Sequence, residues 1–307
     1  MALTANLRGR DSRVPEFIGS RENRWIKQFR AALAGEKLRD GAGAGAGARG
    51  GEAEVVGVEG PHLVETALSS GVEVSAVLIS ESGARHLEKL GKSIPASARL
   101  LSTSDRLFAQ VAATEMPQGI AALVRPRRAT FDDLVSGVPL LLVMAGVQDP
   151  GNVGTLLRTA EAFGASGAIA CSARGTGTAD PFGPKAMRAS AGSALRLPVL
   201  RGVAAPVLLA QLRVAGIRVY ASAPDAEAAD GAPVRVAPWH VNWRQASALL
   251  VGNEGAGLPA DLLRSSDGVV CIPQAAVREA GARVESLNAA IAGAILLYEA
   301  ARQRGLG

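Results

Sequence analysis

Short apolar runs alternate with amphipathic stretches along most of this chain. Between residues 54 and 126, each run is followed by a stretch whose apolar side chains recur at helical spacing. The alternation resumes at residues 140–147, where the run is apolar throughout, as is typical of a strand covered on both faces. It ends with an amphipathic stretch at residues 286–304. This pattern predicts an α/β protein in which helices cover a mostly parallel sheet.

Breaks in the pattern divide the chain into domains. The first residues show no hydrophobic periodicity and are expected to form a mobile tail. After an amphipathic stretch at residues 21–33, a Gly- and Ala-rich segment has no side chains to bury, which predicts a flexible loop. A basic stretch before residue 129 leads into a polar connection. We expect a tail (1–20), a first domain (21–128) with its flexible loop (41–51), a linker (129–138) and a second domain (139–307).

The amino-acid composition indicates which side chains fill the core and in which cellular compartment the protein is expected. At 307 residues the chain is long enough for two domains, and with 48% hydrophobic but only 4% aromatic residues its core must be mainly aliphatic. No apolar run reaches the ~18 residues that span a bilayer, and the first residues lack the apolar centre of a signal peptide. Cys171 and Cys271 lie in or beside apolar runs, which is typical of buried, reduced thiols. We therefore expect a cytoplasmic protein without membrane contact.

The net charge and the motifs of the sequence limit the kinds of ligand and catalytic site that we expect. The net charge of +5 is compatible with phosphate contacts but favours a nucleic-acid partner only slightly. His62, His86 and His240 are scattered, and no HExxH, CxxC pair or GxSxG occurs, so neither a metal nor a histidine base is expected. Residues 91–93 end like a P-loop but lack its upstream glycine, and residues 252–257 do not spell GxGxxG.

Segments in the second domain carry polar groups directly after apolar runs. They are residues 149–164 (DPGNVGTLLRTAEAFG), residues 249–259 (LLVGNEGAGLP), and the pair Ile272-Pro273 followed by residues 286–288 (SLN). Open α/β sheets bind their ligands at the carboxyl ends of the strands. Three such ends in one domain predict a single composite site.

Each segment alone leaves two interpretations open. Asn152 and Arg158 could bring an amide and a fixed cation to a phosphate near a helix start. They could equally be a capping residue and one half of a surface ion pair with Glu161. Glu254 lies between flexible glycines, as in a ligand-binding loop or a simple turn. Ser286 is a candidate N-cap of the last helix.

Together the segments resemble the motifs of the SpoU (TrmH-like) family of RNA 2′-O-ribose methyltransferases, within the SPOUT superfamily. An N-x-G followed by R-T-A is matched by Asn152, Gly154, Arg158, Thr159 and Ala160. The N-E-G-x-G-L loop stands at residues 253–258, and I-P followed by S-L-N is met by Ile272, Pro273, Ser286, Leu287 and Asn288. The resemblance covers about residues 138–304. It departs from the family pattern in the longer segment 274–285, which falls where the methyl donor of the family binds.

The resemblance implies a parallel sheet threaded into a deep trefoil knot, a homodimer, and S-adenosylmethionine held in the knotted loops. By position in the motifs, the cofactor-binding residues are Gly252, Asn253, Gly255, Ile272 and Leu287. The catalytic set is Arg158, Asn152, Glu254, Ser286 and Asn288. Within that set Arg158 is expected to activate a ribose 2′-hydroxyl, and the others to hold nucleotide and cofactor.

The first domain resembles the L30e-like substrate-binding domain of ribosomal RNA members of this family, through residues 56–67 and 117–124. The expected substrate is therefore RNA, and 23S ribosomal RNA in particular. The alternatives are a transfer-RNA 2′-O-methyltransferase and a knotted RNA-binding protein without activity. An ordinary metabolite-binding α/β enzyme is a further alternative, but it would need a glycine fingerprint or a catalytic histidine.

Overall fold

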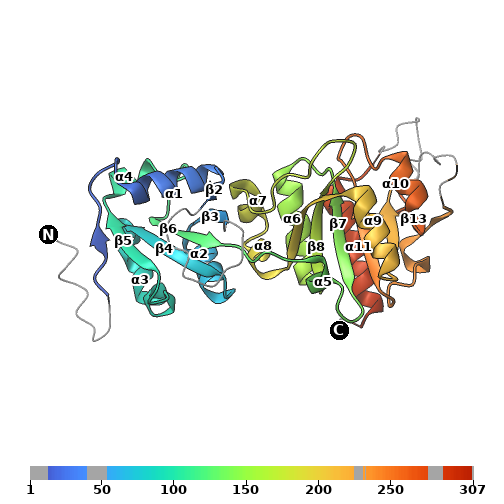
Figure 1. Cartoon of the computed structure of the whole chain (residues 1–307), viewed down its shortest axis with the longest axis horizontal. Coiled ribbons are helices and arrows are strands. Elements are labelled where there is room, and N and C mark those ends of the chain that lie inside the picture. Colours follow the sequence, from blue (N-terminus) through green and yellow to red (C-terminus); the bar gives the residue numbers. More distant parts are fainter. Residues whose placement is uncertain (1–12, 40–53, 225–230, 232, 276–285, 306–307) are drawn as a thin grey trace. The chain divides into compact units, whose positions relative to one another are not determined.

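The computed structural model describes residues 13–39, 54–224, 231, 233–275 and 286–305 (Figure 1). Within it the chain forms two compact units, one from residues 1–127 with 182–184 and the other from residues 128–181 with 185–307. The loop predicted at residues 41–51 and most of the segment 274–285 lie outside the described residues.

The first unit is built on a six-stranded sheet in the order β1-β5-β4-β6-β3-β2. Its strands are β1 (Glu16–Phe17), β2 (Leu38–Arg39), β3 (Glu54–Glu59), β4 (Glu73–Ser80), β5 (Arg99–Thr103) and β6 (Ile120–Arg125). Its helices are α1 (Arg24–Ala34), α2 (Pro61–Ser69), η1 (Ser82–Ala84), α3 (Arg85–Leu90), η2 (Gly91–Ser93) and α4 (Asp105–Ala109). The sheet is mixed, because β6 runs antiparallel to both of its neighbours, β3 and β4. The prediction of a mostly parallel sheet is wrong for this unit, since hydrophobic alternation carries no information on strand direction.

The end of the predicted mobile tail (1–20) belongs to the sheet of the first unit. Residues 1–12 lie outside the described residues, but Glu16 and Phe17 pair with β5 and Ile18 is buried. The guanidinium of Arg13 donates hydrogen bonds to the carbonyl oxygens of Ile94, Pro95, Ala96 and Ala98. A two-residue strand is too short to show a period of two, which is why periodicity missed it.

The second unit is built on an entirely parallel seven-stranded sheet in the order β11-β13-β10-β12-β7-β8-β9. Its strands are β7 (Leu140–Ala145), β8 (Gly167–Ser172), β9 (Val199–Ala204), β10 (Arg218–Ser222), β11 (Arg235–Val236), β12 (Ser247–Val251) and β13 (Gly268–Val270). The predicted strand at residues 140–147 is β7, an interior strand between β12 and β8, and every residue of it is buried. The α/β class and the parallel sheet are confirmed here, whereas the trefoil knot stays a prediction from the resemblance.

Helices cover both faces of this sheet. They are α5 (Phe131–Leu134), α6 (Pro150–Ala162), α7 (Pro184–Ala189), α8 (Ser193–Arg196), α9 (Ala205–Val214), η3 (Pro238–His240), α10 (Ala260–Ser265) and α11 (Ala289–Gln303). Helix α5 falls inside the predicted linker 129–138, because Thr130 and Asp133 form a capping box and Leu134 is buried in the core. The linker is therefore partly helical, unlike the prediction.

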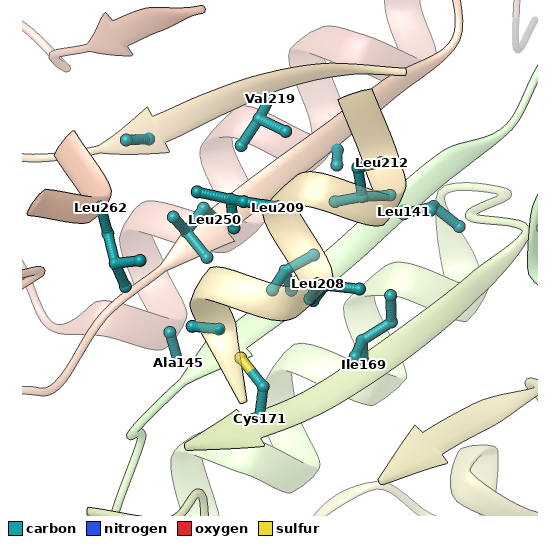
Figure 2. Close-up of a cluster of buried hydrophobic side chains, with 14 of the residues drawn as sticks. Leu141, Ala145, Ile169, Cys171, Leu208, Leu209, Leu212, Val219, Leu250 and Leu262 are labelled. Carbon is teal, nitrogen blue, oxygen red and sulfur yellow. The ribbon is translucent and has the colours of Figure 1, made fainter. Parts of the chain in front are cut away.

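One face of the sheet packs against α9 and α10. Figure 2 shows Leu208, Leu209 and Leu212 of α9 packed over the strands, with Leu262 of α10 beside them. Cys171 lies in the same cluster, and its burial raises the pKa of the thiol to about 12. Neither Cys171 nor Cys271 forms a disulfide and both are buried, as predicted.

The other face is covered by α6 and α11, which pack against each other. A Cβ at Gly293 would lie 2.3 Å from Cδ2 of Leu156 on α6. The buried side of α11 is therefore Ala290, Gly293, Leu296, Leu297, Ala300 and Ala301.

Helix α11 has a second apolar side, which is exposed in the single chain. Ile291, Ile295 and Tyr298 are 52%, 38% and 55% exposed. Helix α11 is apolar on both sides, so hydrophobic period alone could not show which side packs inward. Among the described residues, no helix combines the length and apolarity that a membrane span requires.

Candidate active site

The predicted site segments meet at one edge of the parallel sheet. Strands β7 and β12 are hydrogen-bonded neighbours, so the loops that leave their carboxyl ends lie next to each other. Asn152 lies in the first turn of α6 after β7, and Glu254 lies in the loop after β12. Asn288 precedes α11, which packs on α6. The sheet topology therefore brings all three motifs together, as the sequence predicted.

Side-chain hydrogen bonds join the three motifs directly. The Nδ2 atom of Asn152 donates to Oε1 of Glu254 at 2.9 Å. The Nδ2 atom of Asn288 donates to Oδ1 of Asn152 at 3.1 Å. Glu254 also accepts from the main-chain amides of Gln148 and Asp149, each at 3.1 Å. Residues more than a hundred positions apart in sequence thus form one continuous polar network.

The capping residues differ from those predicted. Asp149, not Asn152, caps α6, because its carboxylate accepts from the amides of Gly151 and Asn152. Asn288, not Ser286, caps α11, and its Oδ1 accepts from the amides of Ala290 and Ile291. Ser286 lies three residues before the first helical residue, too far away to cap it.

A cavity of about 340 Å³ opens beside this network. It is lined by the ends of β10 and β12, by the loop after β12, and by residues on either side of the segment 276–285. All residues predicted to bind the cofactor line it: Gly252, Asn253, Gly255, Ile272 and Leu287. Glu254 and Ser286 line it as well.

The loop between Gly252 and Leu258 is folded tightly on itself. A Cβ at Gly252 would lie 2.7 Å from the carbonyl carbon of Gly257, so only glycine fits there. The side chain of Asn253 forms hydrogen bonds through both its amide nitrogen and its amide oxygen. Its Nδ2 donates to the carbonyl oxygen of Gly146 and to Gln148, and its Oδ1 accepts from the amides of Gly255 and Ala256. Asn253 therefore shapes the cavity wall through the main chain.

The network holds its carboxylates ionised. Burial raises the pKa of Glu254, but the hydrogen bonds from Asn152 and from the amides of Gln148 and Asp149 outweigh it and hold the pKa below its usual value. The amides of Gly151 and Asn152 likewise lower the pKa of Asp149. Both groups therefore act as hydrogen-bond acceptors near neutral pH.

Arg158 stands apart from the network. It lies exposed in the second half of α6 and does not line the cavity. The alternative ion pair with Glu161 is wrong, because Glu161 pairs with Arg196, whose Nη2 lies 2.7 Å from Oε2. Within the described part of the chain, Arg158 has no hydrogen-bond or ion-pair partner. A free guanidinium near the site remains available to a ligand.

Sequence reasoning missed some residues of the site. Gln148 and Asp149 contribute main-chain amides, and Ser222 at the end of β10 lines the cavity. The pair Asp149-Pro150 is a signature of a helix start, with a capping acid before a first-turn proline, and could have identified the cap. Nothing in the sequence around Ser222 distinguishes it from other strand ends.

Two families of known proteins match parts of this chain. The SpoU rRNA Methylase family matches residues 139–298, which is more than half of the chain. The chain belongs to the SpoU rRNA methylase family. A second family, the MRM3-like substrate binding domain, matches residues 51–122 in the first unit. The SpoU membership confirms the resemblance and makes the chain a methyltransferase, with the predicted site in the SpoU domain.

Individual relatives match over most of their length. The 23S rRNA (guanosine(2553)-2'-O)-methyltransferase RlmP of Bacillus subtilis (strain 168) is 35% identical over 241 residues, which cover 78% of this chain and 86% of that protein. The 23S rRNA (guanosine-2'-O-)-methyltransferase RlmB of Burkholderia sp is 34% identical over 68% of this chain and 79% of that protein. The AdoMet-bound rRNA methyltransferase from Sinorhizobium meliloti superposes with a TM-score of 0.73 and 26% identity, covering 94% of this chain and 97% of that one.

Proposed function

We propose that this SpoU methyltransferase uses S-adenosylmethionine to methylate a ribose 2′-hydroxyl in 23S ribosomal RNA. The observation that carries the proposal is the hydrogen-bonded network of Asn152, Glu254 and Asn288 beside a cavity lined by every residue predicted to bind the cofactor. Relatives named as 23S ribosomal RNA 2′-O-methyltransferases match most of the chain and support the substrate. A substrate in the ribosome would place the enzyme in the cytoplasm.

The cavity suits S-adenosylmethionine. Its volume of about 340 Å³ lies in the usual range of ligand pockets. Leu258, Leu263 and Ile272 offer apolar surface for a base, and Ser222 and Ser286 offer hydroxyl groups. When bound, the cofactor supplies an activated sulfonium methyl group. Gly252, Asn253, Gly255, Ile272 and Leu287 would hold it.

The remaining task of the protein is to position and activate the ribose hydroxyl. Fixing two reactants in a productive geometry lowers a barrier by as much as ~7–11 kcal/mol in favourable cases. Asn152, Glu254, Ser286 and Asn288 form the frame that holds nucleotide and cofactor. Arg158, a cation without a protein partner in the described part of the chain, stabilises the alkoxide that develops as the hydroxyl loses its proton.

The first unit serves as the reader of the RNA in this proposal. Its match to a substrate binding domain supports this role. We place the domain boundary between residues 128 and 139, as the sequence predicted. A variant that lacks residues 1–128 should keep cofactor binding, because the cavity lies in the second unit, and should lose methyl transfer to RNA.

A homodimer is also part of the proposal. Ile291, Ile295 and Tyr298 form an exposed apolar stripe on α11, at helical spacing, and Tyr298 contacts Phe163 edge-on with ring centroids 5.6 Å apart. Contiguous exposed apolar side chains of this kind mark protein interfaces. Ile295→Lys should convert a dimer into a monomer in sedimentation analysis, while Val214→Lys, at an exposed apolar position elsewhere, should leave the mass unchanged.

The proposed function is tested with the intact protein, labelled S-adenosylmethionine and an unmodified 23S ribosomal RNA transcript. Nuclease digestion of the product should give a single labelled 2′-O-methylated nucleoside. Label on a base, or labelling of transfer RNA alone, would overturn the proposed substrate. Binding of both cofactor and RNA without any transfer would favour a knotted RNA-binding protein that lacks activity.

A further inference from the structure

Both oxygens of the Glu254 carboxylate are already engaged by the protein. Oε1 accepts from the amide of Asp149 at 3.1 Å and from Nδ2 of Asn152 at 2.9 Å. Oε2 accepts from the amide of Gln148 at 3.1 Å. An ionised carboxylate offers only acceptor sites, and these three N–H groups occupy much of that capacity.

This carboxylate dictates the orientation of two further side chains. Because Glu254 can only accept, Asn152 must turn its Nδ2 toward it, which leaves Oδ1 of Asn152 facing Asn288. Asn288 must then donate with its own Nδ2. Its Oδ1 is thereby directed to the amides of Ala290 and Ile291, where it caps α11. One acid thus sets the direction of every hydrogen bond from the β12 loop to α11.

The same contacts argue against proton abstraction by Glu254. A general base must keep a lone pair within hydrogen-bond reach of the substrate proton and a pKa near the working pH. The amide donors satisfy the carboxylate and hold its pKa below the usual range, with the opposing effect of burial outweighed. The carboxylate instead links the loop after β12 to the start of α6 through hydrogen bonds.

We infer that Glu254 is a positioning residue, which orients Asn152 and Asn288 and fixes α6 and α11 beside the cofactor cavity without touching the RNA. The activity readout of this inference rests on the proposed function, whereas its stability and cofactor-binding readouts do not. The inference predicts that direction of hydrogen bonding, and not negative charge at position 254, is what the site requires.

Substituting Glu254 or Asn152 alone should place two groups of the same hydrogen-bonding type against each other. In Glu254→Gln the new amide group turns a donor toward other donors, and in Asn152→Asp a second carboxylate faces Glu254. A reacting group displaced by 1 Å can lose ~100-fold in rate. We expect each variant to lose about that much in kcat, with a smaller change in KM for RNA. Both should melt at a lower temperature and bind S-adenosylhomocysteine more weakly than the wild type, because Glu254 lines the cavity.

The double variant Glu254→Gln/Asn152→Asp reverses the polarity of the pair. The new amide at position 254 can now donate to the new carboxylate at position 152, which also still accepts from Asn288. The same amide group keeps its oxygen for the main-chain amide of Gln148, whereas its Nε2 replaces the oxygen that accepts from the amide of Asp149. We expect the double variant to recover part of the melting temperature and of the affinity for S-adenosylhomocysteine that each single variant loses, and about tenfold of the lost methyl transfer, as coupled neighbours do.

Glu161→Gln is the control, since it removes the same charge from a carboxylate of α6 that pairs with Arg196 and does not line the cavity. It should leave methyl transfer unchanged. Recovery of melting temperature and cofactor affinity without recovery of methyl transfer would overturn the inference, because the carboxylate itself would then be needed. Absence of any recovery would show that the two residues are not coupled and would overturn it equally. A wild type without methyl transfer would reject the proposed function, and the melting and affinity data would still decide the inference.

Discussion

The same three elements, β7, β12 and α11, are tied together at both edges of the parallel sheet, by opposite means. At the amino-terminal edge, Arg304 after α11 donates to the carbonyl oxygens of Val138 and Pro139 before β7 and of Trp243 and Gln245 before β12. At the carboxyl-terminal edge, Glu254, Asn152 and Asn288 join the same elements beside an open cavity.

The two edges of the sheet differ in whether they leave polar groups available to a ligand. Burial lowers the pKa of Arg304, and its guanidinium is consumed by main-chain carbonyls, so that edge can only stabilise the fold. At the carboxyl-terminal edge, asparagine amides and one carboxylate form the internal bonds beside an open cavity. Arg158, further along α6, has no partner among the described residues. Structure and chemistry are thus separated onto opposite ends of the same strands, as in other open α/β sheets.

The largest expected effect comes from removing the free arginine. Arg158→Ala should lower methyl transfer by about 1,000-fold, because in the proposed reaction this cation stabilises a developing oxyanion, which forms mainly in the transition state. Cofactor affinity by calorimetry and the melting temperature should stay at wild-type values, since Arg158 is exposed and does not line the cavity. Turnover near the wild-type rate would show that Arg158 has no part in the reaction.

The opposite edge should respond in stability alone. Arg304→Ala strips the guanidinium from four carbonyl oxygens, and we expect a loss of about 3 kcal/mol in the free energy of unfolding, measured with denaturant. Activity per folded molecule should be unchanged. The neighbouring exposed Arg302, paired with Glu299, is the matched control, and Arg302→Ala should cost no more than about 0.5 kcal/mol. Equal losses in the two variants would remove the distinction between the edges.

The packing of α6, which carries Asn152, against α7 can be tested at Gly154. A Cβ there would lie 2.4 Å from the carbonyl oxygen of Ala186 and 2.6 Å from Cβ of Ala189. Gly154→Ala should therefore destabilise the unit by about 2 kcal/mol through overpacking between α6 and α7. Gly177→Ala, where a Cβ meets no atom within 4 Å, serves as the comparison. A melting temperature unchanged in Gly154→Ala would contradict the close contact.

The smallest effect is a dependence on pH. The folded state holds the pKa of Glu254 below its ordinary value of 4.5, so its contribution is complete above pH 4.5 and is lost as the pH falls through the lower folded value. Because the Glu254 carboxylate is largely exposed, the wild type should melt only about 2 °C above Glu254→Gln where the carboxylate is ionised. Melting curves should converge for wild type and Glu254→Gln below that range. Parallel curves at every pH would indicate that Glu254 is not ionised in the folded protein.

Much of this architecture could be predicted from the sequence, for identifiable reasons. The runs that became β7 and β12 are buried along their whole length, α6 begins with a first-turn proline, and polar residues after the two strands mark the carboxyl-terminal edge. The bonding pattern within the site could not be predicted, because Asn152 is compatible both with capping and with the contact to Glu254 that it makes.

Other elements gave too little signal. The edge strand β9 contains Arg201 and Gly202 and is only partly buried, so it lacks a clear pattern. Helix α11 is apolar on both sides, and its packing was decided by Gly293 against Leu156, a contact that no single-sequence pattern contains. The direction of β6 depends on tertiary pairing in the same way.

The most direct test of the account is titration calorimetry of the intact protein with S-adenosylmethionine and S-adenosylhomocysteine. If the carboxyl-terminal edge is the active site, both ligands bind at about one site per chain, and Arg158→Ala binds them equally well. Gly252→Ala, whose Cβ would collide with Gly257, should weaken binding about tenfold or more. A folded wild type that binds neither ligand, or a Gly252→Ala variant that binds both as tightly as the wild type, would contradict the assignment of this cavity.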